Sequence, residues 1–192
     1  MALTYSTSLA LGTPAPDFAL PDADGKVVRL SDLKGAPALL VMFICNHCPY
    51  VQHVRYCVAD LAREYQKKGI RVVAINSNDV TRYPADSAPL MKEEAKLAGY
   101  SFPYLLDEKQ DVAKKYYAAC TPEFYVFDKQ QKLTYHGRLD GSSPGNNVPA
   151  TGEELRAALD ATLAGKSAAA VQKPSMGCNI KWKPGNEPEY AR

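Results

Sequence analysis

The sequence predicts an α/β fold in which helices flank a central mixed β-sheet. Three segments carry this prediction: the apolar runs 38–44 and 72–75, and the amphipathic segment 48–68 between them. Continuous apolar runs of strand length are typical of strands that are buried on both faces. A strand, a helix and a second strand in this order form a right-handed parallel crossover.

The composition places the chain among ordinary soluble globular proteins. It has 192 residues, of which 46% are hydrophobic and 23% charged, and its net charge is +2. Such a balance favours neither nucleic acid nor a membrane surface as a partner. We see no signal peptide and no apolar run near the ~18 residues of a membrane span, so we expect a cytoplasmic protein. Export of a form whose signal has been removed is the alternative.

A β-hairpin is expected near the N-terminus. Residues 17–20 and 26–30 flank a Pro-Asp-Ala-Asp-Gly segment with Asp-Gly turn chemistry. The helix over 48–68 follows the first buried strand and ends at Gly69. Its apolar residues recur every three or four positions and form one stripe: Val51, Val54, Val58, Leu61 and Tyr65.

A third unit spans residues 77–107. Asp86 is the expected N-cap of a helix that ends before Gly99, and 102–106 has the character of a short strand. A brief helix over 110–117 and a hairpin made by 123–127 and 132–136 are expected next.

The last helix is predicted from a capping box. Thr151 and Glu154 have the spacing of this motif, and Gly165 ends the helix. Its inward residues are Leu155, Leu159 and Leu163.

The chemistry is expected at the pair Cys45 and Cys48, which lies between the first buried strand and the amphipathic helix. Unpaired N–H groups and the dipole at a helix N-terminus favour thiolate over thiol and lower a cysteine pKa. His47 adds a positive charge for the Cys45 thiolate when it is protonated. We expect Cys45 to be the exposed nucleophile and Cys48 the buried partner.

The other three of the five cysteines have less certain roles. Cys120 is either a third redox thiol or a small buried residue, and Cys178 is either a resolving cysteine or a packing residue. Cys57 borders the apolar stripe and is expected in the core. Cys178 and the single tryptophan, Trp182, lie in a C-terminal extension, 166–192, that we expect to dock on the domain formed by 1–165.

Several of these segments resemble the thioredoxin superfamily, in particular the bacterial peroxiredoxin-like or redoxin-domain proteins of AhpC/TSA and TlpA type. The matching segments are Gly-Thr-Pro-Ala-Pro-Asp-Phe at 12–18, Leu-Ser-Asp-Leu-Lys-Gly at 30–35, Cys45 to Pro49, Thr121-Pro122 before Glu-Phe-Tyr-Val-Phe-Asp, and Gly-Cys-Asn-Ile-Lys-Trp at 177–182. The resemblance implies a thioredoxin-like fold in which 77–107 is an insertion. It also implies a cis peptide bond before Pro122, with the Thr121 backbone facing the cysteine pair and open to a substrate chain that adds as a strand.

The sequence departs from these families in two respects. Leu39 stands where thioredoxins carry a buried acid. If Cys48 takes the place of the peroxidatic cysteine of peroxiredoxins, the accompanying threonine and proline are replaced by Cys45 and Val41.

Three functions follow from the cysteine pair. The first is a thiol–disulfide oxidoreductase in which Cys45 attacks a protein or small-molecule disulfide and Cys48 resolves it. The second is a peroxiredoxin-like thiol peroxidase, an antioxidant that reduces hydroperoxides through a sulfenic acid. The third is a copper-binding module that uses His47, His53 and the cysteines. A zinc ribbon would need a second pair of this spacing.

For the first two functions we expect no cofactor and no bound metal, because the redox-active disulfide is regenerated by an external thiol reductant. The remaining histidine, His136, is expected at the surface.

Overall fold

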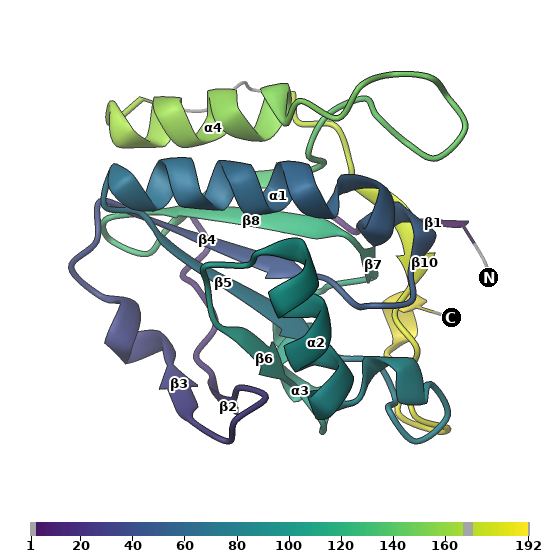
Figure 1. Ribbon diagram of the computed structural model, residues 1–192. Coiled ribbons are helices and arrows are strands. Elements are labelled where there is room, and N and C mark those ends of the chain that lie inside the picture. The colour runs from purple at the N-terminus through teal and green to yellow at the C-terminus, as the bar shows by residue number, and fades with distance from the viewer. Residues whose placement is uncertain (1–2, 167–170, 192) are drawn as a thin grey trace.

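The computed structural model describes residues 3–166 and 171–191. Residues 1–2 of the expected 1–165 domain lie outside the described residues. So do residues 167–170 and 192 of the expected 166–192 extension. A five-stranded sheet with the strand order β6-β5-β4-β8-β9 forms the centre (Figure 1). Its strands are β4 (Ala38–Phe43), β5 (Arg71–Asn76), β6 (Tyr104–Leu106), β8 (Glu123–Asp128) and β9 (Leu133–Gly137).

The sheet is mixed, as the sequence predicts. β4, β5 and β6 run parallel, whereas β8 and β9 are antiparallel to their neighbours. Every residue of β4 is buried, because alternate side chains enter two separate hydrophobic cores. Leu40 and Met42 lie in one core, and Leu39, Val41 and Phe43 lie in the other.

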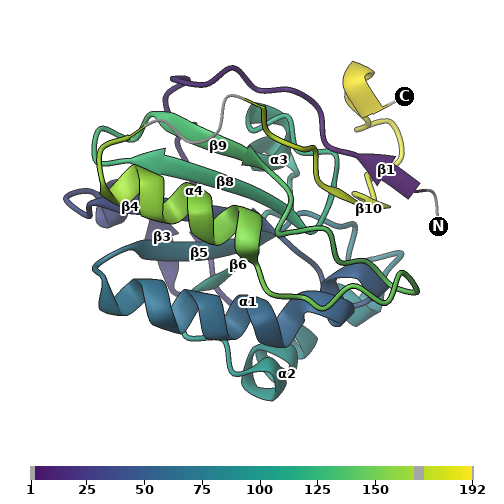
Figure 2. The ribbon, with the colours of Figure 1, turned by 90° about the horizontal axis from the view of Figure 1, so that it is seen from above.

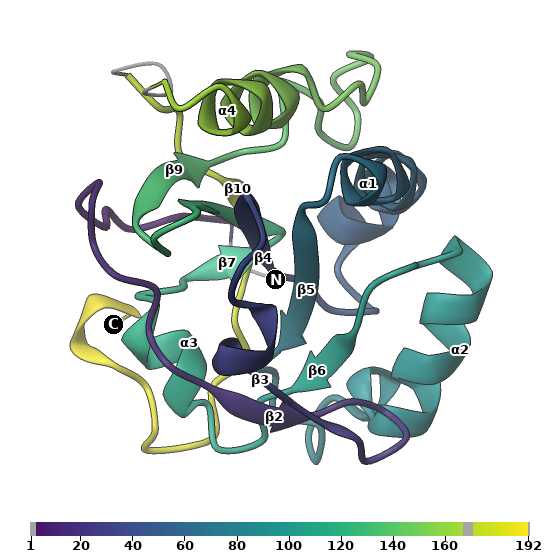
Figure 3. The same ribbon diagram turned by 90° about the vertical axis from the view of Figure 1, so that its left-hand side faces the viewer.

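Helices cover both faces. α1 (Pro49–Lys67) and α4 (Glu153–Leu163) lie side by side over one face, as Figure 2 shows, and α2 (Ala88–Ala98) packs beside α1. All five residues of the predicted α1 stripe are buried. The opposite face is covered by α3 (Asp111–Lys115), together with the hairpin of β2 (Ala19–Pro21) and β3 (Val27–Arg29) (Figure 3). The thioredoxin-like fold and its N-terminal hairpin are therefore confirmed.

A second, three-stranded sheet lies beside the N-terminal end of α1. It consists of β1 (Leu3–Tyr5), β10 (Met176–Asn179) and β7 (Cys120–Thr121), with β10 in the middle and both pairings antiparallel (Figure 1). The chain continues from β10 into the core opposite α1, where Ile180 and Trp182 are buried. β1 and the C-terminal segment that contains β10 thus lie together at one edge of the molecule.

The structure corrects two predicted helix caps. Asp86 ends a short 3-10 turn, and Ser87 is the N-cap of α2. Thr151 and Glu154 form no capping box, because the N-cap of α4 is Gly152 in the left-handed conformation at φ 71°. The Asp140 carboxylate accepts the N–H groups of Thr151 and Gly152 instead, at 2.8 and 2.6 Å.

Helix length and polarity bear on the membrane question. Within residues 3–166 and 171–191, no helix is both long and apolar enough to cross a membrane.

Candidate functional site

The cysteine pair lies in the turn that joins β4 to α1. Cys45 follows the end of β4 by two residues, and Cys48 is the N-cap residue of α1. Pro49 occupies the first helical position, where its missing N–H costs no hydrogen bond. The N–H of Val51, in the first turn, donates to the sulfur of Cys48. The helix terminus therefore acts on the second cysteine of the pair.

A loop from the other half of the sheet closes over both sulfurs. The Thr121–Pro122 peptide bond is cis, as the resemblance implies. Cys45 Sγ lies 3.4 Å from the Thr121 hydroxyl, and Cys48 Sγ lies 3.2 Å from the Thr121 carbonyl oxygen. One residue thus contacts both thiols through two different groups.

The thiolate is expected at Cys48 rather than at Cys45. A hydrogen bond donated by Cys45 lowers the pKa of Cys48 to about 5, against burial, with further donation from Cys178, Val51 and Thr121. The Thr121 carbonyl oxygen can accept a hydrogen bond from the Cys48 thiol and so favours protonated Cys48, but it is one acceptor against several donors. The pKa of Cys45 is raised because it donates to Cys48, is buried and lies near the Asp86 carboxylate. These contacts favour a thiolate at Cys48, whereas the sequence pattern predicts it at Cys45.

The exposed fractions agree with the predicted burial of Cys48 and contradict the predicted exposure of Cys45. Cys45 is 1% exposed and Cys48 0% exposed, so neither is an exposed nucleophile. The reason is tertiary: the Thr121 loop and β10 pack against the turn, and both sulfurs join the core beneath α1. A substrate reaches the pair only by a local opening or as a small molecule.

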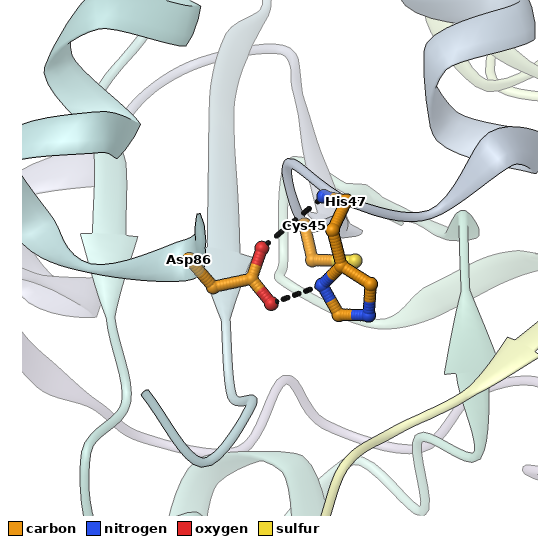
Figure 4. Close-up of side chains that lie close together, drawn as sticks. All are labelled: Cys45, His47 and Asp86. Carbon is orange, nitrogen blue, oxygen red and sulfur yellow. Dashed lines mark hydrogen bonds and ion pairs between the residues drawn. The ribbon is translucent and has the colours of Figure 1, made fainter. Parts of the chain in front are cut away.

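His47 is held by a carboxylate that sequence analysis assigned elsewhere. Asp86 Oδ2 lies 2.6 Å from His47 Nδ1, and Asp86 Oδ1 accepts the His47 backbone N–H at 3.3 Å (Figure 4). The same Oδ1 accepts the N–H of Asn46 at 2.8 Å. Asn78 donates to the same carboxylate at 2.8 Å. The His47 ring stacks on the Tyr83 ring, with 5.3 Å between the ring centroids. Asp86 was missed as a site residue because its partners lie about 40 positions away, and no local pattern reports that contact.

Three potential metal ligands meet at this point. One ligand atom each from Cys45, His47 and Asp86 lies within 4.8 Å of the others. His53, which the sequence suggested as a copper ligand, contacts Ser142 instead, at 2.6 Å. A metal ion bound by this group would use the Cys45 sulfur, so metal binding and disulfide formation at Cys45 are mutually exclusive.

The remaining cysteines differ in their distance from the pair. Cys178, on β10, hydrogen-bonds with Cys48 and is the register partner of Thr121. Cys120 is buried on β7, and its sulfur lies 3.7 Å from Glu123 Oε2. Cys57 is half-buried and packs at the border of the core, as predicted.

Glu123 is a second buried carboxylate that the sequence did not reveal. It is 0% exposed and accepts the backbone N–H groups of Ala119 and Cys120, at 2.9 and 3.1 Å. It also accepts the Tyr125 hydroxyl and contacts His136 Nε2, both at 2.6 Å. His136 is therefore buried rather than at the surface, and this network holds the start of β8 next to the cis-proline.

A cleft of about 290 Å³ opens beside the cis-proline. Tyr50, Val54, Pro122, Phe124 and Met176 form much of its apolar lining, and Arg138 and Asp140 add charge. None of the cysteines lines it. The cleft could hold an apolar part of a substrate next to Pro122, but it does not itself open onto the sulfurs.

Comparison with known families and proteins also indicates an oxidoreductase. The model of the AhpC/TSA family matches residues 11–136. The thiol-disulfide oxidoreductase ResA of Geobacillus thermodenitrificans is 29% identical over 132 residues, which cover 68% of this chain and 70% of ResA. The chloroplastic peroxiredoxin Q of Triticum aestivum is 30% identical over 131 residues, 65% of this chain and 57% of the relative.

A solved structure matches almost the whole chain. The crystal structure of an uncharacterized conserved protein from Geobacillus kaustophilus has 54% sequence identity and a TM-score of 0.94, and it covers 96% of this chain and 98% of its own. Because this match extends beyond residue 136, the C-terminal segment with β10 falls largely within the shared structure.

Proposed function

Because this chain belongs to the AhpC/TSA family, we propose that it is a thiol–disulfide oxidoreductase whose Cys45 and Cys48 cycle between dithiol and disulfide. The hydrogen bond between the two sulfurs at the start of α1 carries this proposal. Both sulfurs also contact Thr121, at 3.4 and 3.2 Å. Two sulfurs in hydrogen-bonding contact need little movement to join in a disulfide. The similarity to ResA, which is named for this activity, supports the same reaction class.

In the proposed reaction Cys48 attacks and Cys45 resolves. The Cys48 thiolate attacks one sulfur of a substrate disulfide, forms a mixed disulfide and releases the other sulfur as a thiolate. Cys45 then attacks Cys48 Sγ and gives its proton to one departing thiolate, the other takes up a proton from water, and the substrate leaves as two thiols. Two electrons move from the pair to the substrate, and an external thiol restores the dithiol. The cycle uses protein sulfur and that reductant only.

Reduction of insulin by dithiothreitol tests this proposal. We expect the wild-type chain to accelerate the reaction and Cys48→Ser to lose the acceleration. Cys45→Ser should still react with a disulfide at Cys48, and mass mapping after non-reducing digestion should find Cys48 in a disulfide. Cys57→Ala serves as the control and should retain activity, because Cys57 lies outside the pair. A mixed disulfide trapped on Cys45 in Cys48→Ser would reverse the two roles.

A thiol peroxidase is the second candidate, and the state of Cys48 favours it. Cys48 is a fully buried cysteine whose pKa is lowered to about 5. A hydroperoxide is small enough to reach such a sulfur. The thiolate would attack the peroxide, take one oxygen as a sulfenic acid and release an alcohol or water after protonation; Cys45 would then displace water and form the disulfide.

Hydroperoxide consumption coupled to dithiothreitol separates the two functions. A peroxidase should consume hydroperoxide catalytically and lose this activity in Cys48→Ser. Acceleration of insulin reduction without peroxide turnover would support the oxidoreductase and contradict the peroxidase. Stoichiometric binding of Cu(I) or Zn(II) by the reduced chain, lost in both Cys45→Ser and His47→Ala, would instead indicate the metal-binding alternative.

A further inference from the structure

The chain's own C-terminal strand occupies the edge that the resemblance leaves open to a substrate strand. β10 pairs antiparallel with β7, and Cys178 is the register partner of Thr121. An incoming peptide that added to β7 would pair with the same Thr121 backbone. The structure therefore places an internal cysteine at the position where a substrate chain would present its own sulfur.

A glycine allows this close approach. A Cβ on Gly177 would lie 1.9 Å from the Thr121 carbonyl oxygen and 2.7 Å from its carbonyl carbon, so only a residue without a side chain fits. With β10 held at this distance, the Cys178 thiol hydrogen-bonds with Cys48. Cys48 thus contacts two thiols, Cys45 on one side and Cys178 on the other.

We propose that Cys178 is a third redox-active thiol, which forms a disulfide with Cys48 during turnover. The proposal rests on the proposed thiol–disulfide exchange and names a second route for its resolving step. Cys178 attacks Cys48 Sγ in the mixed disulfide, a Cys48–Cys178 disulfide forms, and the substrate sulfur leaves and takes up the Cys178 proton. The same two electrons reach the substrate as in resolution by Cys45. Exchange with Cys45 then regenerates the Cys178 thiol without any change in oxidation state.

The charges around Cys178 fit a group that reacts only after Cys48 has reacted. Burial and the bond to Cys48 raise the pKa of Cys178 to about 12, and Lys181 opposes them. Asn179 holds the Lys181 ammonium through its carbonyl and side-chain oxygens, at 2.8 and 2.6 Å. Once Cys48 is in a disulfide, it no longer carries a negative charge and no longer accepts the Cys178 hydrogen bond. Both of these effects keep Cys178 protonated in the reduced protein.

Cys120 provides the matched control. It is as deeply buried as Cys178 and lies on the strand beside it, with Asn179 as its register partner. Its sulfur faces the Glu123 carboxylate at 3.7 Å. A carboxylate at that distance disfavours the thiolate, so Cys120 should not replace Cys178.

The experiment uses the full-length chain with Cys45→Ser and oxidised glutathione as the disulfide. Mass mapping after non-reducing digestion should find a disulfide that links Cys48 to Cys178. Adding Cys178→Ala should leave glutathione on Cys48 and lengthen the life of that mixed disulfide at least tenfold. Adding Cys120→Ala instead should leave the Cys48–Cys178 disulfide intact. Thermal unfolding of each reduced variant establishes that it is folded.

The possible failures are distinguishable. Lasting glutathione on Cys48 in Cys45→Ser itself, or a disulfide to Cys120, would overturn the role of Cys178 and leave the proposed function standing. Absence of any reaction between glutathione disulfide and Cys48 would overturn both. Should Cys178→Ala be unfolded, the location of the disulfide in Cys45→Ser still decides the question, because that variant retains Cys178.

Discussion

Replacing Gly177 by alanine should displace β10 from the cysteine pair. The new Cβ would lie 1.9 Å from the Thr121 carbonyl oxygen, where ordinary contact begins at 3.4 Å, so the strands must separate by about 1.5 Å. A separation of that size takes N–H···O bonds out of hydrogen-bonding range. Overpacking costs about 1–3 kcal/mol and each lost ladder bond about 1 kcal/mol, so we expect the free energy of unfolding to fall by about 3 kcal/mol.

Urea unfolding and alkylation of Cys48 measure the two consequences. Separation of β10 from β7 also removes Cys178 from Cys48, so iodoacetamide should label Cys48 at least about tenfold faster at neutral pH, which corresponds to about 1.4 kcal/mol of lost protection. Gly141→Ala is the control, because its Cβ meets only the flexible Arg138 side chain, at 3.6 Å. If Gly177→Ala matched the Gly141→Ala variant in both stability and labelling, the reasoning about β10 would be refuted.

Three further predictions concern charge and burial. Asp86→Asn should lower the pKa of Cys45, because it removes a buried negative charge. It should also cost about 3 kcal/mol of stability, because Asp86 Oδ1 and Oδ2 accept hydrogen bonds from Asn46 and Asn78 that an amide cannot replace in full. Ultraviolet thiolate titration and urea unfolding measure these effects, and an unchanged Cys45 titration would contradict the first. The lowered pKa of Cys48 should stabilise the reduced fold fully above the unfolded-state value of about 8.5 and lose that contribution as the pH falls through about 5. The stability difference between wild type and Cys48→Ala should therefore shrink towards acid pH under reducing conditions, and a constant difference would argue against the thiolate. Trp182→Ala should cost about 3–5 kcal/mol in urea unfolding, because a buried indole leaves a cavity; a loss below about 1 kcal/mol would show that the C-terminal segment contributes little to the fold.

Local patterns were sufficient for much of the fold. The apolar run that becomes β4, the three-four spacing that becomes α1, and the hairpin of β8 and β9 all lie where the sequence predicts them. Each depends on side chains within about a dozen positions of one another, so the periodicity is visible in the chain itself. The cis bond before Pro122 came from a resemblance to a family, because local sequence does not determine it.

Helix caps were less predictable, and the errors have a common cause. Asp86 has the residue type of an N-cap, but its carboxylate instead binds the turn that contains Asn46 and His47. Thr151 and Glu154 have the spacing of a capping box, but Asp140 takes the N–H groups at the helix start. In both cases a carboxylate binds donors in another segment of the chain, which a rule based on neighbouring residues does not consider.

The sequence by itself predicted where the redox chemistry would lie, because two cysteines three positions apart at the start of a helix are a local feature. Only the tertiary structure decided which sulfur is the thiolate and what surrounds it. Ionisation of a buried thiol depends on the donors and charges within a few ångströms, and here these come from Thr121, Asp86 and Cys178, which lie 38 to 130 positions from Cys48. Burial weakens the screening by water, so these distant residues act on the sulfurs together with the hydrogen bond between Cys45 and Cys48.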